Sequence, residues 1–196
     1  MKIVVLTLVL LLSACESSQI YQKAPYKTNI AKKYPAVSII VNDGLYDSFK
    51  QVHMHQGIVK SLRKANVFKR ISVNNNTITS FTFDIRIQEN SEENFVGIMI
   101  LALTLGLIPT ERKRHFDMDV TILYKNSILK KLHYSTDGTE LLYIGNNFAT
   151  TIHQAMDSLV SYLLSDIEKE KVFEGTSILK KIKKKEMKRI IHLSIV

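Results

Sequence analysis

The 196-residue chain has one cysteine, no tryptophan, three prolines and seven glycines. A single cysteine excludes an intramolecular disulfide framework, so the fold must rest on its hydrophobic core. The scarcity of proline and glycine argues against extended low-complexity structure. The chain also lacks a Gly-x-Ser-x-Gly elbow and a glycine-rich phosphate loop, so no motif indicates the hydrolase or nucleotide-binding classes that depend on them.

Six histidines are present, but none has metal-ligand spacing to another. His53 and His55 are two residues apart, and on a helix such residues point about 200° from each other, so they cannot bind one ion. Glycoside hydrolysis needs two carboxylates in one cleft. Solvated strand faces account for acids such as Asp84, Asp117 and Asp119. We therefore expect no enzyme activity, no metal and no cofactor.

The first fourteen residues have the pattern of an export signal. Lys2 carries the one charged side chain, residues 3–12 are apolar, and Ser13 and Ala14 are small. At about ten residues the apolar run is too short to cross a hydrocarbon core of ~30 Å as a helix. The single Cys15 follows directly.

The stretch Leu12-Ser13-Ala14-Cys15 resembles the lipobox of bacterial lipoproteins. In that family the cysteine thiol receives a diacylglycerol, the chain is cleaved before it, and the new amino group is acylated. The resemblance implies that Cys15 is the first residue of the mature chain and its palmitate-type anchor, which holds stably because it carries more than one acyl chain. In enterobacteria an aspartate after this cysteine tends to retain the protein at the inner membrane. Glu16 therefore implies the outer membrane, facing the periplasm. An ordinary signal peptide with a chance cysteine is the alternative.

The chain divides into four segments: a signal peptide (1–14), a polar tether (15–34), one folded domain (35–170) and a basic tail (171–196). Of the formal charge of +9, a net of +6 lies in residues 176–196, where seven Lys and Arg accompany one acid. Export argues against a nucleic-acid partner. Anionic lipid headgroups or the acidic cell-wall polymer are the candidate contacts of the tail, and a solvated, frayed C-terminus is the alternative.

Hydrophobic periodicity predicts a single α+β domain in the order β-α-β-β-β-α, with an antiparallel-rich sheet and two main amphipathic helices on one face. Lys125-Asn126-Ser127 predicts the turn of a hairpin, and Asp137-Gly138 predicts another turn after its second strand. The predicted strands and helices cover residues 37–41, 45–65, 77–88, 116–124, 128–134 and the stretch from 148 to about 169.

This order is similar to that of small periplasmic lipoprotein domains of the curli-secretion and penicillin-binding-protein-activator groups. The resemblance covers residues 35–166 and includes the exit from the first helix, Leu62 followed by Asn66-Val67-Phe68. It implies a fold and no function.

A second hydrophobic segment, "FVGIMILALTLGLI" at residues 95–108, has fourteen residues and no charge. As a helix it would span about 21 Å, which is shorter than a bilayer core, and Pro109 ends it. Residues 98–103 do not alternate, which argues against a membrane-barrel strand. Three interpretations stay open: a core element buried on all sides, a segment lying in the leaflet beside Cys15, or a buried partner or oligomer interface. In the second, the candidate membrane contacts are Phe95, Ile98, Met99, Leu101, Leu103 and Leu105, with Arg112, Lys113 and Arg114 reaching headgroups.

The leading hypothesis is a non-catalytic, lipid-anchored periplasmic protein that acts as an accessory or interaction module in the cell envelope, with the membrane and an envelope protein as partners. The alternative is a protein that binds lipid or another apolar ligand in a pocket between the sheet and the hydrophobic segment. An envelope enzyme is the third possibility.

Overall fold

The computed structural model describes residues 34–43, 48–73, 79–144 and 148–173. Several predictions fall on residues 1–33, which include Cys15, and on residues 174–196 of the basic tail; these lie outside the described residues. The described part is one α+β domain with two long helices on one face of the sheet, as predicted. Its elements are β1 (Val37–Asp43), α2 (Ser48–Ala65), β2 (Ile71–Val73), β3 (Phe81–Glu93), α3 (Phe95–Leu103), β4 (Thr110–Tyr124), β5 (Ser127–Leu142) and α4 (Phe148–Lys169).

The five strands form a mixed sheet in the order β2-β1-β3-β4-β5. β1 pairs in parallel with both β2 and β3, whereas β3, β4 and β5 form a long antiparallel meander. β4 and β5 are joined by a two-residue turn in which Lys125 and Asn126 have φ of 47° and 64°. Such left-handed pairs match the twist of a hairpin, so the turn predicted at this position is confirmed.

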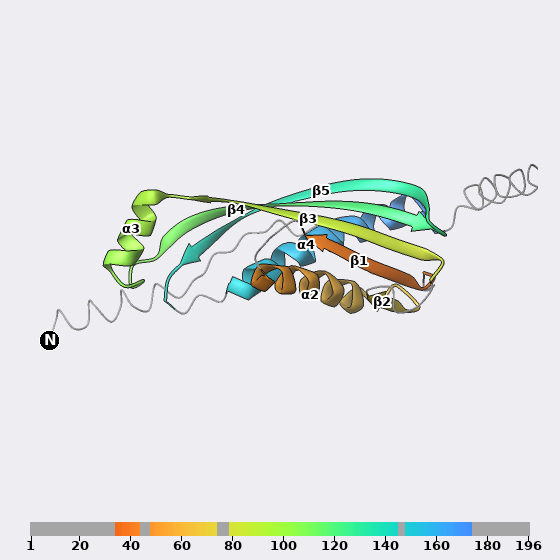
Figure 1. Ribbon diagram of the computed structural model, residues 1–196, viewed down its shortest axis with the longest axis horizontal. Helices are drawn as coiled ribbons and strands as arrows, with labels where there is room; N and C mark the ends of the chain where they lie inside the picture. The colour runs from red at the N-terminus through yellow and green to blue at the C-terminus, as the bar shows by residue number, and fades with distance from the viewer. Residues whose placement is uncertain (1–33, 44–47, 74–78, 145–147, 174–196) are drawn as a thin grey trace, which may run out of the picture.

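The core lies between the sheet and the helices α2 and α4, which both cover the same face (Figure 1). In α4 the apolar residues recur at helical spacing, and this stripe is buried as predicted. On the strands the buried positions alternate with polar ones, so that the other face of the sheet is polar. The core residues that α4 contributes to this contact include Ile152, Met156, Leu159, Leu163 and Ile167.

The two long helices approach closely at Gly57 of α2. A Cβ built on this glycine would lie 2.8 Å from Met156 Cγ and 3.0 Å from His153 Nδ1. The absence of a side chain at Gly57 therefore lets α4 pack directly against the α2 backbone. This contact brings the His153 ring edge-on to the His53 ring, with centroids 5.7 Å apart.

The turn predicted at Asp137-Gly138 is wrong. Both residues lie inside β5, where Asp137 pairs with His115 and Gly138 pairs with Arg114 of β4. The Asp-Gly pair has turn propensity only as an isolated segment, and the fifteen-residue β4 provides backbone partners that extend the ladder through it. As a result β5 continues to Leu142, eight residues past the predicted end at Tyr134. The short β2 was also not predicted.

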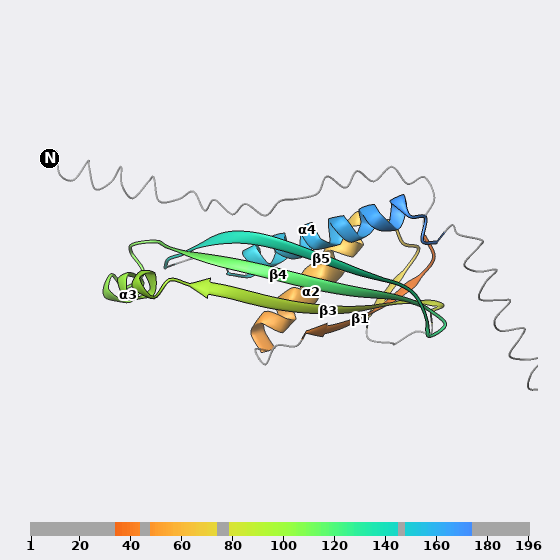
Figure 2. The same cartoon turned by 90° about the horizontal axis from the view of Figure 1, so that it is seen from above.

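The meander reaches well beyond the helices. In both views β3 and β4 continue past the ends of α2 and α4, and α3 lies at the far end, away from the core (Figures 1 and 2). We call this projecting part of β3, β4 and β5 the arm. Its helix-facing positions change from apolar to charged, from Ile87 and Phe116 to Glu89 and Arg114.

Candidate functional site

The main functional candidate is the apolar tip, defined as residues 95–108 at the end of the arm. Its helix α3 begins after Asn94, whose side-chain oxygen accepts a hydrogen bond from the Val96 backbone N–H at 3.0 Å. Neither its first nor its last turn carries a charged residue, and none of its residues is buried. The interpretation of this segment as a core element buried on all sides is therefore wrong. The reason is topological, because the segment connects the two strands of the arm where no helix lies beneath them.

Nine large apolar side chains of the tip are exposed to solvent in the described structure. Leu103 is 79% exposed and Phe95 is 74% exposed, whereas Leu101 is half-buried. A contiguous exposed apolar patch of this kind marks a contact site for a protein or a membrane. The nine residues are Phe95, Val96, Ile98, Met99, Ile100, Leu103, Leu105, Leu107 and Ile108.

The tip has a defined backbone despite its exposure. Helix α3 ends where the Gly106 N–H donates to Leu101 O at 2.7 Å, with Leu105 and Gly106 at φ of 52° and 77°. A left-handed glycine after the last helical turn is a common helix stop. Gly106 also lies against Ile144, whose N–H donates to Gly106 O at 3.0 Å. A Cβ at Gly106 would approach Ile144 Cγ1 to 2.7 Å. The absence of a side chain at Gly106 therefore allows the tip to pack against Ile144, just after the end of β5.

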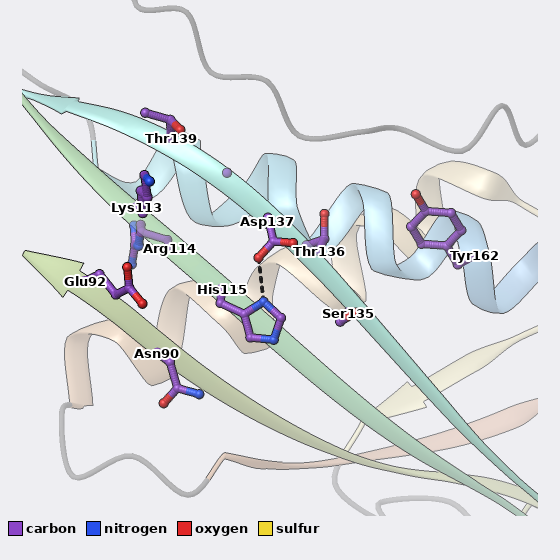
Figure 3. Close-up of a pocket in the computed structure, with 11 residues that line it drawn as sticks. Asn90, Glu92, Lys113, Arg114, His115, Ser135, Thr136, Asp137, Thr139 and Tyr162 are labelled. Atoms are coloured by element: carbon purple, nitrogen blue, oxygen red, sulfur yellow. Dashed lines mark hydrogen bonds and ion pairs between the residues drawn. The ribbon is translucent and has the colours of Figure 1, made fainter.

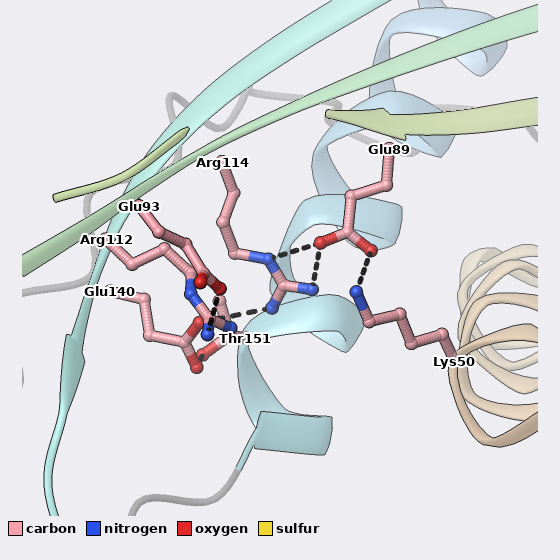
Figure 4. A network of polar contacts seen from close by, with 7 residues as sticks. All are labelled: Lys50, Glu89, Glu93, Arg112, Arg114, Glu140 and Thr151. Carbon is pink, nitrogen blue, oxygen red and sulfur yellow. Dashed lines mark hydrogen bonds and ion pairs between the residues drawn. The ribbon is translucent and has the colours of Figure 1, made fainter. Parts of the chain in front are cut away.

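A buried ion-pair network supports the arm below the tip (Figure 4). The Arg114 guanidinium lies between two buried carboxylates: its Nε donates to Glu89 Oε1 at 2.8 Å and its Nη1 donates to Glu140 Oε2 at 3.3 Å. Lys50 Nζ of α2 lies 3.6 Å from Glu89 Oε2, and Thr151 of α4 donates to Glu140 Oε1 at 3.4 Å. One network of ion pairs and hydrogen bonds therefore joins strands β3, β4 and β5 to both long helices, and it fixes the direction of the arm relative to the core.

This network corrects the prediction that Arg114 reaches lipid headgroups, because Arg114 is only 1% exposed. The alternation of Phe116, Met118, Val120 and Ile122 places residue 114 in the same phase, so the sequence contained the signal that this arginine points inward. Arg112 is ion-paired with Glu93 of β3. Lys113 is exposed, and it pairs in register with Glu92.

The open face of the sheet carries a row of alternating carboxylates and imidazoles. His115 Nδ1 donates to Asp137 Oδ1 at 2.6 Å, and His115 Nε2 lies 3.2 Å from Asp117 Oδ2. His133 contacts the same Asp117 at 3.6 Å, and Asp119 at 2.9 Å. Sequence reasoning missed this row, because the β4–β5 register brings together residues that have no spacing relationship along the chain.

An open groove of about 710 Å³ lies at the end of this row that carries His115 and Asp137, and it is lined by residues of β3, β4 and β5 and by Tyr162 (Figure 3). The hydrogen bond that His115 donates to Asp137 is the main cause that raises the pKa of His115, and partial burial opposes it. Among the described residues, no three His, Cys, Asp or Glu side chains converge so that they could hold a metal ion. The predicted absence of catalytic and metal-binding residues stays a prediction.

No family model and no curated protein matches the chain. Solved structures with a similar arrangement include the PelC dodecamer from Paraburkholderia phytofirmans, with 8% identity, a TM-score of 0.43, and coverage of 76% of this chain and 97% of that one. A minor lipoprotein from Acinetobacter baumannii has 13% identity and a TM-score of 0.39, covering 70% and 95%. A lipoprotein from Neisseria meningitidis has 9% identity and a TM-score of 0.35, covering 69% and 99%. At these levels of similarity, the likenesses establish no shared function.

The described structure separates the predicted contact residues into two groups. Phe95, Ile98, Met99, Leu103 and Leu105 are exposed together on the tip, whereas Arg114 is buried below it. No helix in the described part of the chain is long and apolar enough to cross a membrane.

Proposed function

We propose that this chain is a non-catalytic lipoprotein that is anchored through Cys15 in the outer membrane, faces the periplasm and acts as an accessory or interaction module of the cell envelope. The observation that carries the proposal is the exposed apolar tip at the end of a supported arm. The lipobox resemblance supports the anchor, and the geometry of the arm supports the contact function.

The arm is built to present its end rather than to enclose a substrate. Exposed apolar side chains lower solubility, so a large contiguous set of them is retained where another surface covers it. Here the exposed side chains lie at the end of β3 and β4. Arg114 of β4 binds Glu89 of β3 and Glu140 of β5, and these contacts hold the strands together below the tip. A supported arm of this kind holds its tip at a defined distance and angle from the domain, as a contact surface requires.

The carrier alternative is not favoured by a specific observation. It required a pocket between the sheet and the hydrophobic segment, but α3 lies beyond the end of the sheet and does not cover it (Figure 2). The hollow next to the tip is lined by charged and polar side chains rather than by an apolar surface. Its lining residues are Glu92, Glu93, Asn94, Glu111 and Lys113.

The proposal can be tested in intact cells with a photo-crosslinking amino acid. The probe is placed at Leu103 on the tip and, as a matched control, at Lys131, which is exposed on the open face of β5. We expect adducts to lipid or to an envelope protein from position 103 and several-fold fewer from position 131.

The lipid anchor is tested separately. Metabolic labelling with an alkyne fatty acid should modify the wild type and not Cys15→Ser. An unlabelled wild type would refute the anchor, and equal adducts at both positions would refute the contact function.

A further inference from the structure

The apolar tip differs from a protein-docking helix in the distribution of its side chains. A helix that binds in a protein groove has one apolar stripe and one polar face. At 100° per residue, the apolar residues of α3 are distributed around its whole circumference, and the helix carries no charged side chain. Only the side that carries Gly97 and Leu101 is partly covered, where Gly97 lies against Thr110 of β4. A helix that is apolar on every side and exposed over the rest of its surface fits a surrounding medium rather than a groove. That medium is the acyl region of a lipid bilayer.

A cluster of charged residues next to the tip would limit the depth to which it could enter a bilayer. We call Glu92, Glu93, Glu111, Arg112 and Lys113, which lie on β3 and β4 directly next to the tip, the charged collar. Helix α3 lies across the end of the arm (Figure 1), so that its thickness, about 10–12 Å with side chains, sets the depth of the tip beyond the collar. That thickness suits immersion in the headgroup and outer acyl region of one leaflet, where interfacial helices bury about 5–10 Å.

The collar also decides which lipid the tip recognises. Its three acids and two bases give a formal charge of −1, and Arg112 is engaged by Glu93. The collar therefore has no positive excess with which to attract anionic headgroups. Entry of the tip depends on apolar contact with acyl chains, which zwitterionic lipids supply equally well.

The dimensions allow the tip and the proposed lipid anchor to meet one leaflet. Val37 at the start of β1 pairs with Phe81 at the start of β3, so the tether joins the domain at the end opposite the tip. The thirteen residues of β3 span roughly 44 Å at about 3.4 Å per residue. Residues 16–33 could extend over up to roughly 60 Å. The tether is thus long enough to run the length of β3.

We infer that the apolar tip inserts into the acyl region of the same leaflet that holds the Cys15 lipid, and that insertion is independent of anionic headgroups. The identity of this leaflet rests on the proposed function. The protein would then contact the membrane at two points, the lipid anchor and the tip. These two contacts would set the orientation of the domain.

The test measures the depth of the tip in vesicles. The full lipidated chain is reconstituted in phosphatidylcholine, and Leu103→Cys is labelled with an environment-sensitive fluorophore, since acylated Cys15 offers no free thiol. Brominated lipids should quench the label at 103 at least two-fold, and leave a label on Lys131→Cys unchanged. Replacing phosphatidylcholine by phosphatidylglycerol, or adding salt, should alter the quenching at 103 less than two-fold.

Matched variants distinguish insertion of the tip from nonspecific adsorption of the protein to the vesicles. Phe95→Ser with Leu105→Ser should reduce the quenching at 103, because two of the most exposed apolar side chains of the tip are removed. Val52→Ser with Ile128→Ser, which removes two exposed apolar side chains elsewhere, should leave the quenching unchanged. None of these four side chains is buried, so the fold should be retained, and circular dichroism checks this.

The outcomes separate the two proposals. Quenching that is equal at 103 and 131, or a label at 103 that is shielded without any bromolipid effect because a second copy or a protein covers it, overturns the inference. Quenching that requires anionic lipid overturns its headgroup-independent part. If Cys15 is not acylated, the proposed function fails. In that case the same measurement in a Cys15→Ser background still decides whether the tip enters lipid.

Discussion

Removing the Arg114 side chain should destabilise the protein far more than removing Arg112, although both arginines lie on β4 and both are ion-paired with glutamates. In Arg114→Ala, the buried carboxylate of Glu140 loses its guanidinium partner and keeps the Thr151 hydroxyl, which carries no charge. Glu89 keeps only Lys50 at 3.6 Å. Deleting one member of a buried ion pair costs about 3–5 kcal/mol, because it leaves an uncompensated charge in the interior. In a chain of 196 residues this corresponds to a melting temperature lower by roughly 6–20 °C.

The assay is urea unfolding, supported by thermal unfolding, of the wild type and three variants. Arg112→Ala is the matched control: its side chain and that of Glu93 are 18% and 39% exposed, so we expect a loss of about 0–1 kcal/mol. Adding Glu140→Gln to Arg114→Ala removes the buried charge that Arg114 balanced and should recover about 1–2 kcal/mol. A decrease in the free energy of unfolding below about 1 kcal/mol in Arg114→Ala, or equal decreases in both arginine variants, would refute the reasoning that burial makes the Arg114 ion pairs important for stability.

Three further predictions concern the tip and two histidines. Gly106→Ala places a Cβ at φ +77° and 2.7 Å from Ile144, so amide exchange in α3 should accelerate roughly ten-fold or more, measured by hydrogen–deuterium exchange; unchanged exchange would contradict the packing role of Gly106. Asp137→Asn should lower the pKa of His115 toward 6.5 in an NMR titration. In the wild type the raised pKa of His115 in the folded state adds stability below the pKa of the unfolded state, and this contribution is lost as pH rises through the folded-state pKa. The variant should therefore be less stable than the wild type only at acidic pH, by under about 1 kcal/mol. Burial lowers the pKa of His153, aided by nearby positive charge, so stability should decline as pH falls below 6.5, and His153→Gln should flatten this decline; an unaltered pH profile would count against it.

The regular elements of the domain could be predicted because their patterns are local. The stripe of α4 and the alternation in β3 and β4 each show which side faces the core, and the structure buries those sides. The turn at Lys125 and Asn126 was also predictable, since it separates two alternating runs. The end of β5 was not, because the length of a strand depends on the backbone partner that another strand provides.

The candidate site was predictable only in part. The unusual character of residues 95–108 was evident from their composition, but the choice between the core and the surface was not. A core helix and an exposed tip have the same apolar sequence, and they differ in whether another element lies over them. The Arg114 network was missed for a related reason: the charged cluster around it suggested a surface, whereas its strand phase pointed inward.

By itself the sequence determined the α+β class, the two amphipathic helices and the existence of an uncharged segment between two charged clusters, because these follow from composition and periodicity along the chain. Only the tertiary structure decided that β3 and β4 run past the helices, that Arg114 is buried between Glu89 and Glu140, and that the apolar segment is exposed at the end of the arm. The physical reason is that burial is a property of what packs against a residue, and for these residues the neighbours come from strands and helices that are distant in the chain.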